Sequence, residues 1–133
     1  MARDEAEVLA ANAAFYEAFS SRDITGMLEL WSQERDVVCI HPGWQILRGR
    51  ASVSASWRAI LSNPESPRVR AEDARALFLG DTAIVTCAEV LFEGVLAATN
   101  VFAREAGTWK LVAHQAGPAR TAPATRDDGE LLN

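Results

Sequence analysis

The sequence has few of the residues that build metal centres and covalent crosslinks. Its 133 residues include two cysteines and two histidines, with no C-x-x-C or H-x-x-x-H pair of the kind that binds zinc. Cys39 and Cys87 lie in the apolar runs VVCI and IVTCAEV, where free cysteine commonly behaves as a small buried hydrophobe. We therefore expect no disulfide framework and no metal, and nothing in the chain demands a cofactor.

Long hydrophobic runs and concentrated positive charge are also missing. No stretch reaches the roughly 18 apolar residues of a membrane span, and the segment MARDEAEVLAANAAF lacks the basic and apolar regions of a signal peptide. The net charge is −5 and the arginines are scattered, which argues against nucleic acid or an anionic membrane as the main partner. The expectation is a cytoplasmic protein with one hydrophobic core.

Three helices are predicted in the first half of the chain. From Asp4 to Ser20, apolar residues recur every three or four positions, the spacing of one helical face. Asp23 is suited to cap a short second helix. A third helix opens at Gly49-Arg50 and ends at Asn63-Pro64, because the residue before a proline disfavours helical geometry.

Strands are predicted between and after these helices. The β-branched segment Val37–His41 ends at a Pro-Gly turn, with Gln45–Arg48 as a hairpin partner. Four apolar runs separated by glycine-containing turns then predict an antiparallel meander: Ala74–Leu79, Ala83–Phe92, Val95–Arg104 and Trp109–Ala116. Helices first and a sheet after indicate an α+β fold with a pocket between the layers. Residues 1–118 are expected to form one domain, and residues 119–133 a flexible tail.

Three strings of the sequence resemble the NTF2-like superfamily, and its small SnoaL-like branch in particular: FYEAFSSRDITGMLELW, CIHPGWQILRGRASVSASWRAIL and ATNVFAREAGTWKLVAHQAGP. With the meander they cover roughly residues 7–118. The resemblance implies a cone in which about three N-terminal helices pack on a strongly curved, mostly antiparallel sheet. Enzymes, binding proteins and assembly domains share this scaffold, so the resemblance implies the fold more narrowly than the function.

Three polar residues are candidates for catalysis. His41 ends the predicted short strand, where an imidazole can act as a base or bind a ligand, or instead bond to the turn backbone. Asn100 interrupts an apolar strand, so its amide contacts either a ligand or another buried polar group. Glu89 lies within TCAEVLF, where burial would raise the pKa of its carboxyl, whereas the opposite alternation would place it in solvent.

The last predicted strand contains two further polar residues. If Trp109, Leu111 and Ala113 face the cavity, strict alternation turns Gln115 toward it as well. His114 then faces the other way, toward a dimer interface. The period alone leaves the inward face undecided, because both faces of these strands are apolar.

The remaining candidates would line a ligand pocket. They are large aromatic or strand residues expected near the cavity, although a tryptophan on a helix stripe, such as Trp57, is more often a core residue. The set comprises Tyr16, Trp31, Cys39, Trp44, Trp57, Phe102 and Gln115.

These residues lead to a hypothesis of small-molecule binding. A cavity with few polar groups suits a hydrophobic or aromatic ligand, and proton transfer of the isomerase, dehydratase or cyclase type is compatible with His41 as base. The sequence leaves open whether the protein is an enzyme. The alternative is an assembly module with a filled cavity. In either case we expect a homodimer through the outer face of the sheet, with Val85, Cys87, Val101 and Val112 on that face.

Overall fold

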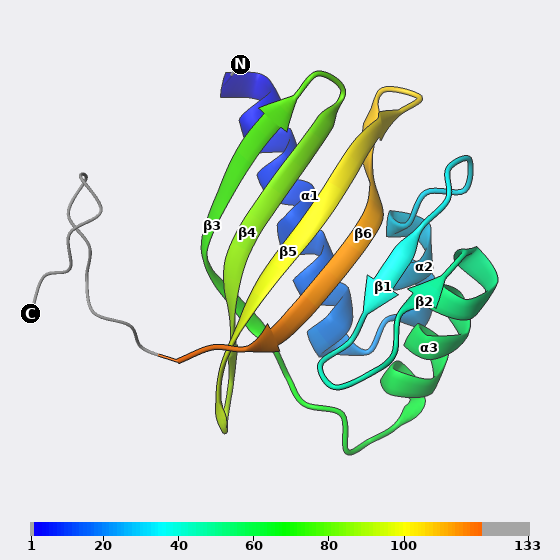
Figure 1. The fold of residues 1–133 in the computed structure, drawn as a ribbon, viewed down its shortest axis with the longest axis vertical. Coiled ribbons are helices and arrows are strands. Elements are labelled where there is room, and N and C mark those ends of the chain that lie inside the picture. The colour runs from blue at the N-terminus through cyan, green and yellow to red at the C-terminus, as the bar shows by residue number, and fades with distance from the viewer. Residues whose placement is uncertain (1, 121–133) are drawn as a thin grey trace, which may run out of the picture.

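The computed structural model describes residues 2–120 and contains three helices and one six-stranded sheet (Figure 1). The helices are α1 (Ala2–Ser21), α2 (Ile24–Leu30) and α3 (Arg50–Ser62). The strands are β1 (Val38–Ile40), β2 (Leu47–Arg48), β3 (Arg70–Leu79), β4 (Thr82–Leu91), β5 (Gly94–Glu105) and β6 (Thr108–Pro118). The α+β fold expected from the sequence is confirmed. Of the expected C-terminal tail, residues 121–133 lie outside the described part of the chain.

The helices cover one face of the sheet, which curves around them (Figure 1). The strand order is β2-β1-β6-β5-β4-β3, and every pairing is antiparallel except that of β1 with β6. The parallel pair brings the first and last strands of the chain together. As a result, Cys39 lies opposite His114, and His41 follows two residues after Cys39.

Local signals explain where the helices begin and end. The Asp23 side chain accepts a hydrogen bond from the Gly26 amide at 2.9 Å, so it caps α2 as the sequence predicts. The apolar face of α1 places Val8 and Phe15 fully inside, where both belong to the core between helices and sheet. None of the helices in residues 2–120 is long and apolar enough to span a membrane.

A β-bulge in β6 changes which side chains face the helices. Val101 pairs with Ala113, but the next residue of β5, Phe102, pairs with Leu111, so Val112 is an extra residue. Leu111 and His114 are therefore both buried, although they lie three positions apart. The prediction from strict alternation, with Gln115 facing inward and His114 outward, is therefore wrong. Gln115 is exposed on the outer face, and His114 faces inward.

The outer face of the sheet has no helix over it among the described residues and contains one apolar row. This row across the strands consists of Leu77, Ile84, Val101, Ala113 and Val38, which are successive register partners. Val85 and Cys87, expected on this face, instead alternate toward the helices and are buried.

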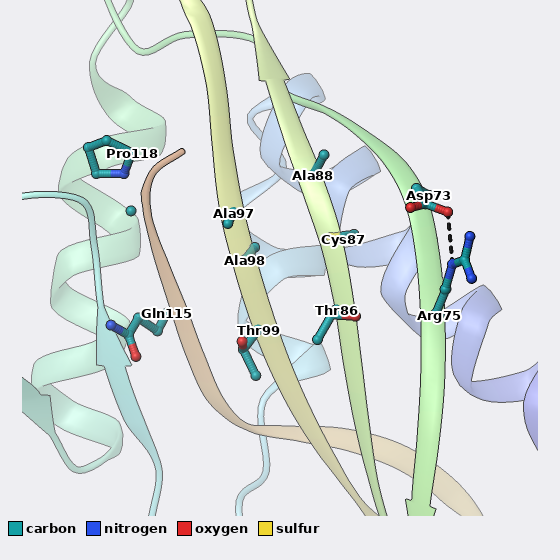
Figure 2. A pocket seen from close by; sticks show the side chains of 11 residues that line it. Asp73, Arg75, Thr86, Cys87, Ala88, Ala97, Ala98, Thr99, Gln115 and Pro118 are labelled. Atoms are coloured by element: carbon teal, nitrogen blue, oxygen red, sulfur yellow. Dashed lines mark hydrogen bonds and ion pairs between the residues drawn. The ribbon is translucent and has the colours of Figure 1, made fainter. Parts of the chain in front are cut away.

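A shallow hollow of about 530 Å³ lies on the outer face (Figure 2). Thr86, Thr99 and Gln115 line it from three neighbouring strands. The charged residues at its edge, Asp73 and Arg75, are exposed and pair with each other at 3.0 Å. This hollow therefore brings no buried carboxyl, imidazole or cationic side chain to a ligand.

Arg50 at the start of α3 fixes the end of α2. Its guanidinium donates to the carbonyl oxygens of Leu28, Trp31 and Ser32 at 2.9, 3.0 and 3.1 Å. The last carbonyls of a helix have no partner within the helix, so these bonds satisfy groups that burial would otherwise penalise.

We expect Arg50→Met to lower the free energy of unfolding by about 2 kcal/mol, because charge-assisted bonds to carbonyl groups are lost. Urea denaturation measures the change. Arg58→Met, on the exposed side of the same helix, is the matched control and should change stability by less than about 0.5 kcal/mol. Equal effects of the two substitutions would contradict this role for Arg50.

Candidate functional site

A cavity of about 360 Å³ opens between the sheet and the helices. Its walls are mainly apolar, and they include Phe19, Trp44, Ile60, Val69, Leu91 and Leu96. The polar side chains that line it are His41, Ser66, Glu89 and His114. An apolar hollow with a few converging polar groups is the usual form of a small-molecule site.

His114 is held by a chain of buried amides behind the cavity. The two hydrogens of Asn100 Nδ2 point to Asn12 Oδ1 at 2.9 Å and to the Tyr16 hydroxyl oxygen at 3.0 Å. The other end of the amide, Asn100 Oδ1, is therefore an acceptor, and His114 Nδ1 donates to it at 2.5 Å. This arrangement fixes the tautomer, because a neutral imidazole with Nδ1–H has a bare nitrogen at Nε2.

Tyr16 extends this chain to Glu89. The phenol accepts from Asn100 Nδ2 and from the Cys87 thiol at 3.3 Å, and it donates to Glu89 Oε2 at 2.7 Å. The same carboxyl oxygen lies 3.9 Å from His114 Nε2. We call these five side chains, Asn12, Tyr16, Glu89, Asn100 and His114, the α1–sheet network.

Burial shifts the pKa of both cavity-facing members of the network. Removal from water and, to a smaller extent, the nearby His41 lower the pKa of His114 to about 3. Burial also raises the pKa of Glu89, against the smaller opposing effect of the hydrogen bond from Tyr16. His114 is therefore uncharged at neutral pH, and its contact with Glu89 is not an ion pair.

His41 reaches the same cavity from the end of β1. Ser56 Oγ donates to the Val53 carbonyl at 2.7 Å, so its lone pair accepts from His41 Nε2 at 2.9 Å. His41 therefore has its hydrogen on Nε2 and a bare Nδ1. The Cys39 sulfur lies 3.6 Å from one ring nitrogen and 3.9 Å from the other, too evenly for a directed bond. Burial lowers the pKa of His41 to about 4.

The structure brings some of the predicted site residues to the cavity. His41, Glu89 and Trp44 line it, and Trp44 packs edge-on against His41 with ring centroids 4.8 Å apart. Asn100 and Tyr16 lie behind it and act through His114 and Glu89.

Other predicted ligand contacts lie elsewhere. Trp31 and Phe102 are in the core, and Trp57 packs between Phe15 and His41 without lining the cavity. Cys39 lies beneath His41, where burial raises the pKa of its thiol to about 12. Gln115 lies on the outer face of the sheet.

Two residues that position the histidines were missed from the sequence. Asn12 and Ser56 lie on the apolar faces of α1 and α3, with Asn12 four positions from both Val8 and Tyr16. A polar side chain within such a face is itself a signal, because a buried polar group needs a partner. Among residues 2–120, no group of three His, Cys, Asp or Glu side chains is placed to hold a metal ion.

The helices, the curved sheet and the cavity between them define a protein of the NTF2-like class. The chain belongs to the SnoaL-like domain family, whose model matches residues 8–120. No protein of curated function matches it.

Two solved structures are similar in both sequence and fold. A proposed dehydratase of the NTF2-like family from Streptomyces avermitilis is 36% identical with a TM-score of 0.81, and the match covers 90% of this chain and 98% of that one. A proposed calcium/calmodulin-dependent protein kinase type II association domain from Thiobacillus denitrificans is 35% identical with a TM-score of 0.75, covering 84% and 94%. An NTF2-like protein of unknown function from Pseudomonas putida shares the fold at 16% identity, with a TM-score of 0.77 and coverage of 99% and 95%.

The buried histidines should make stability depend on pH. An unfolded imidazole has a pKa of about 6.5, so between that value and the folded values the unfolded state binds more protons. The contribution of each histidine is therefore complete above about pH 6.5 and is lost as the pH falls toward 4.

We expect His114→Asn to reduce this loss, because its amide nitrogen can still donate to Asn100 Oδ1 while the titrating ring is gone. Urea denaturation from neutral pH to about pH 4.5 measures the effect. The stability difference between the wild type and the variant should shrink as the pH falls. A difference that stays constant over that range would contradict the buried neutral state of His114.

Proposed function

We propose that the protein binds a small hydrophobic or aromatic molecule in the cavity and transfers a proton on it. One observation is the basis of the proposal: two uncharged imidazoles and a carboxyl of raised pKa line the same apolar space. A pair of titratable groups whose environments move their pKa values in opposite directions is suited to acid and base roles.

The roles follow from the protonation states. His41 and His114 are neutral at physiological pH and each has a bare ring nitrogen, so each can accept a proton from carbon. Their lowered pKa values make them weaker bases than free imidazole, so the reaction needs an acid partner or an acidic C–H bond. Glu89 is that acid. Asn100 and Tyr16 position the two groups without touching the substrate.

Dehydration is one reaction that fits these roles. One imidazole takes the proton from carbon while Glu89 gives its proton to the departing hydroxyl, and water leaves as the carbon–carbon double bond forms. The 36% identical chain described as a proposed dehydratase supports this choice. Isomerisation and cyclisation use the same base and acid.

The base role can be tested with 2-tetralone, an apolar ring ketone with acidic α-hydrogens. We expect the protein to accelerate the exchange of these hydrogens in deuterium oxide, followed by proton NMR. His41→Gln and His114→Asn should each reduce the rate by about 100-fold, because they remove a general base. The matched control is Gln115→Asn, next to His114 but on the other face of β6, which should leave the rate unchanged.

Exchange that survives both histidine substitutions in folded protein would place the base elsewhere. If ring ketones bind and yet no exchange is accelerated, the proposal reduces to binding without catalysis.

The outer face of the sheet supports a second proposal, that two copies of the chain associate there. The row across the sheet described above presents apolar side chains on five strands, and Leu77 at one end of it is 60% exposed. Large exposed apolar areas commonly mark interfaces. The 35% identical chain described as a proposed association domain supports association between chains, without bearing on the face used.

We expect Val101→Lys to convert a homodimer into monomers in sedimentation equilibrium, because it buries an unpaired charge at the centre of the interface. Ala55→Lys on the exposed side of α3 should leave the dimer intact. A wild-type protein that is monomeric at high micromolar concentration would contradict the dimer.

A further inference from the structure

The hydrogens of the two buried imidazoles and of the Ser66 hydroxyl are already in use. His114 Nδ1–H is donated to Asn100 Oδ1, and His41 Nε2–H is donated to Ser56 Oγ. The Ser66 hydroxyl donates to the Ile60 carbonyl. These residues therefore present lone pairs, the bare Nε2 of His114 and the bare Nδ1 of His41 among them. The indole of Trp44, 46% exposed, supplies a donor only at the rim.

The cavity also disfavours negative charge. Among the described residues that line it there is no lysine or arginine, and its one acidic side chain is Glu89. A carboxylate or phosphate entering this space would lose its hydration without gaining a cation, at a cost of several kcal/mol or more. A cation would also lose its hydration between the apolar walls, so a ligand of this site is uncharged.

The separation of Glu89 and His114 leaves a place for one oxygen atom. Glu89 Oε2 and His114 Nε2 are 3.9 Å apart, too far for a direct hydrogen bond, and an oxygen can lie about 2.8 Å from both. A hydroxyl suits that place when the carboxyl of Glu89 is protonated, because it then accepts from Glu89 and donates its own hydrogen to His114 Nε2. An ether oxygen has no hydrogen to give, so it leaves His114 Nε2 without a partner.

We propose that the cavity selects an uncharged apolar ring molecule through a hydroxyl group, which donates its hydrogen to His114 Nε2 between that nitrogen and Glu89. The proposal rests on the proposed function of the cavity and names the class of its ligand: phenols, enols and alcohols of ring compounds rather than their ethers or acids.

The experiment uses four naphthalenes of nearly equal shape: 2-naphthol, 2-methoxynaphthalene, naphthalene and 2-naphthoate. Binding to the full-length protein is measured by calorimetry or ligand fluorescence at neutral pH. We expect 2-naphthol to bind about tenfold more tightly than the ether and naphthalene, the difference made by one hydrogen bond to an otherwise unpaired buried acceptor. The naphthoate should bind most weakly of the four.

Two variants locate the hydroxyl. His114→Asn should bring the affinity ratio of 2-naphthol to 2-methoxynaphthalene close to one, whereas Gln115→Asn should leave it at the wild-type value. Because His114→Asn can disturb folding, Ser56→Ala provides a second test. It frees His41 to present an N–H to the ligand, so ether binding should improve relative to naphthol, with Ser52→Ala on the exposed side of α3 as control.

The possible outcomes distinguish hydroxyl selection from ligand binding in the cavity as such. Binding of the ether or naphthalene as tightly as 2-naphthol would overturn hydroxyl selection and leave the apolar cavity as a binding site. Tightest binding of the naphthoate would overturn the exclusion of anions. Failure of all four compounds to bind would overturn the proposed function together with this inference.

Discussion

The arrangement of the interior depends on one buried amide, Asn100 at the centre of β5. Its three hydrogen bonds join α1 to β5 and β6 through Asn12, Tyr16 and His114. A hydrophobic contact would hold the same elements together but would not define which atoms face each other. The amide does, since its two ends have opposite hydrogen-bonding character and a buried mismatch costs about 1–3 kcal/mol. The orientation of Asn100 thereby decides the tautomer of His114.

Burial has a double effect in this protein. It holds the helices on the sheet, and it also disfavours the charged forms of the ionisable groups of the cavity. Each buried polar atom of the α1–sheet network then needs a neutral partner instead of a counter-ion, and the chain supplies amides, a phenol and a thiol. The same residues that make the interior compatible with folding give the cavity its pattern of acceptors.

The sequence predicts the fold well because helical periodicity, caps and glycine turns are local signals. Asp23 and Pro64 mark helix ends wherever the rest of the chain lies, and the family resemblance adds the order of the layers. The cavity is harder to predict. Period-two alternation fails at Val112, and a single extra residue exchanges the faces of His114 and Gln115. No local signal in LVAHQ marks that bulge. Likewise, Asn12 and Ser56 gain their meaning from partners 88 and 15 residues away.

The parallel pairing of β1 with β6 has a consequence for how the family can diversify. It brings His41, just after the end of β1, close to His114 within β6, while the turn after His41 and the segment after α3, with Trp44 and Pro67, form the cavity's edge outside the sheet. These connections contribute no member of the α1–sheet network. Insertions and substitutions there can reshape the entrance for a different ligand while the two imidazoles and the Glu89 carboxyl keep their alignment, so recognition can change without disturbing the buried polar groups.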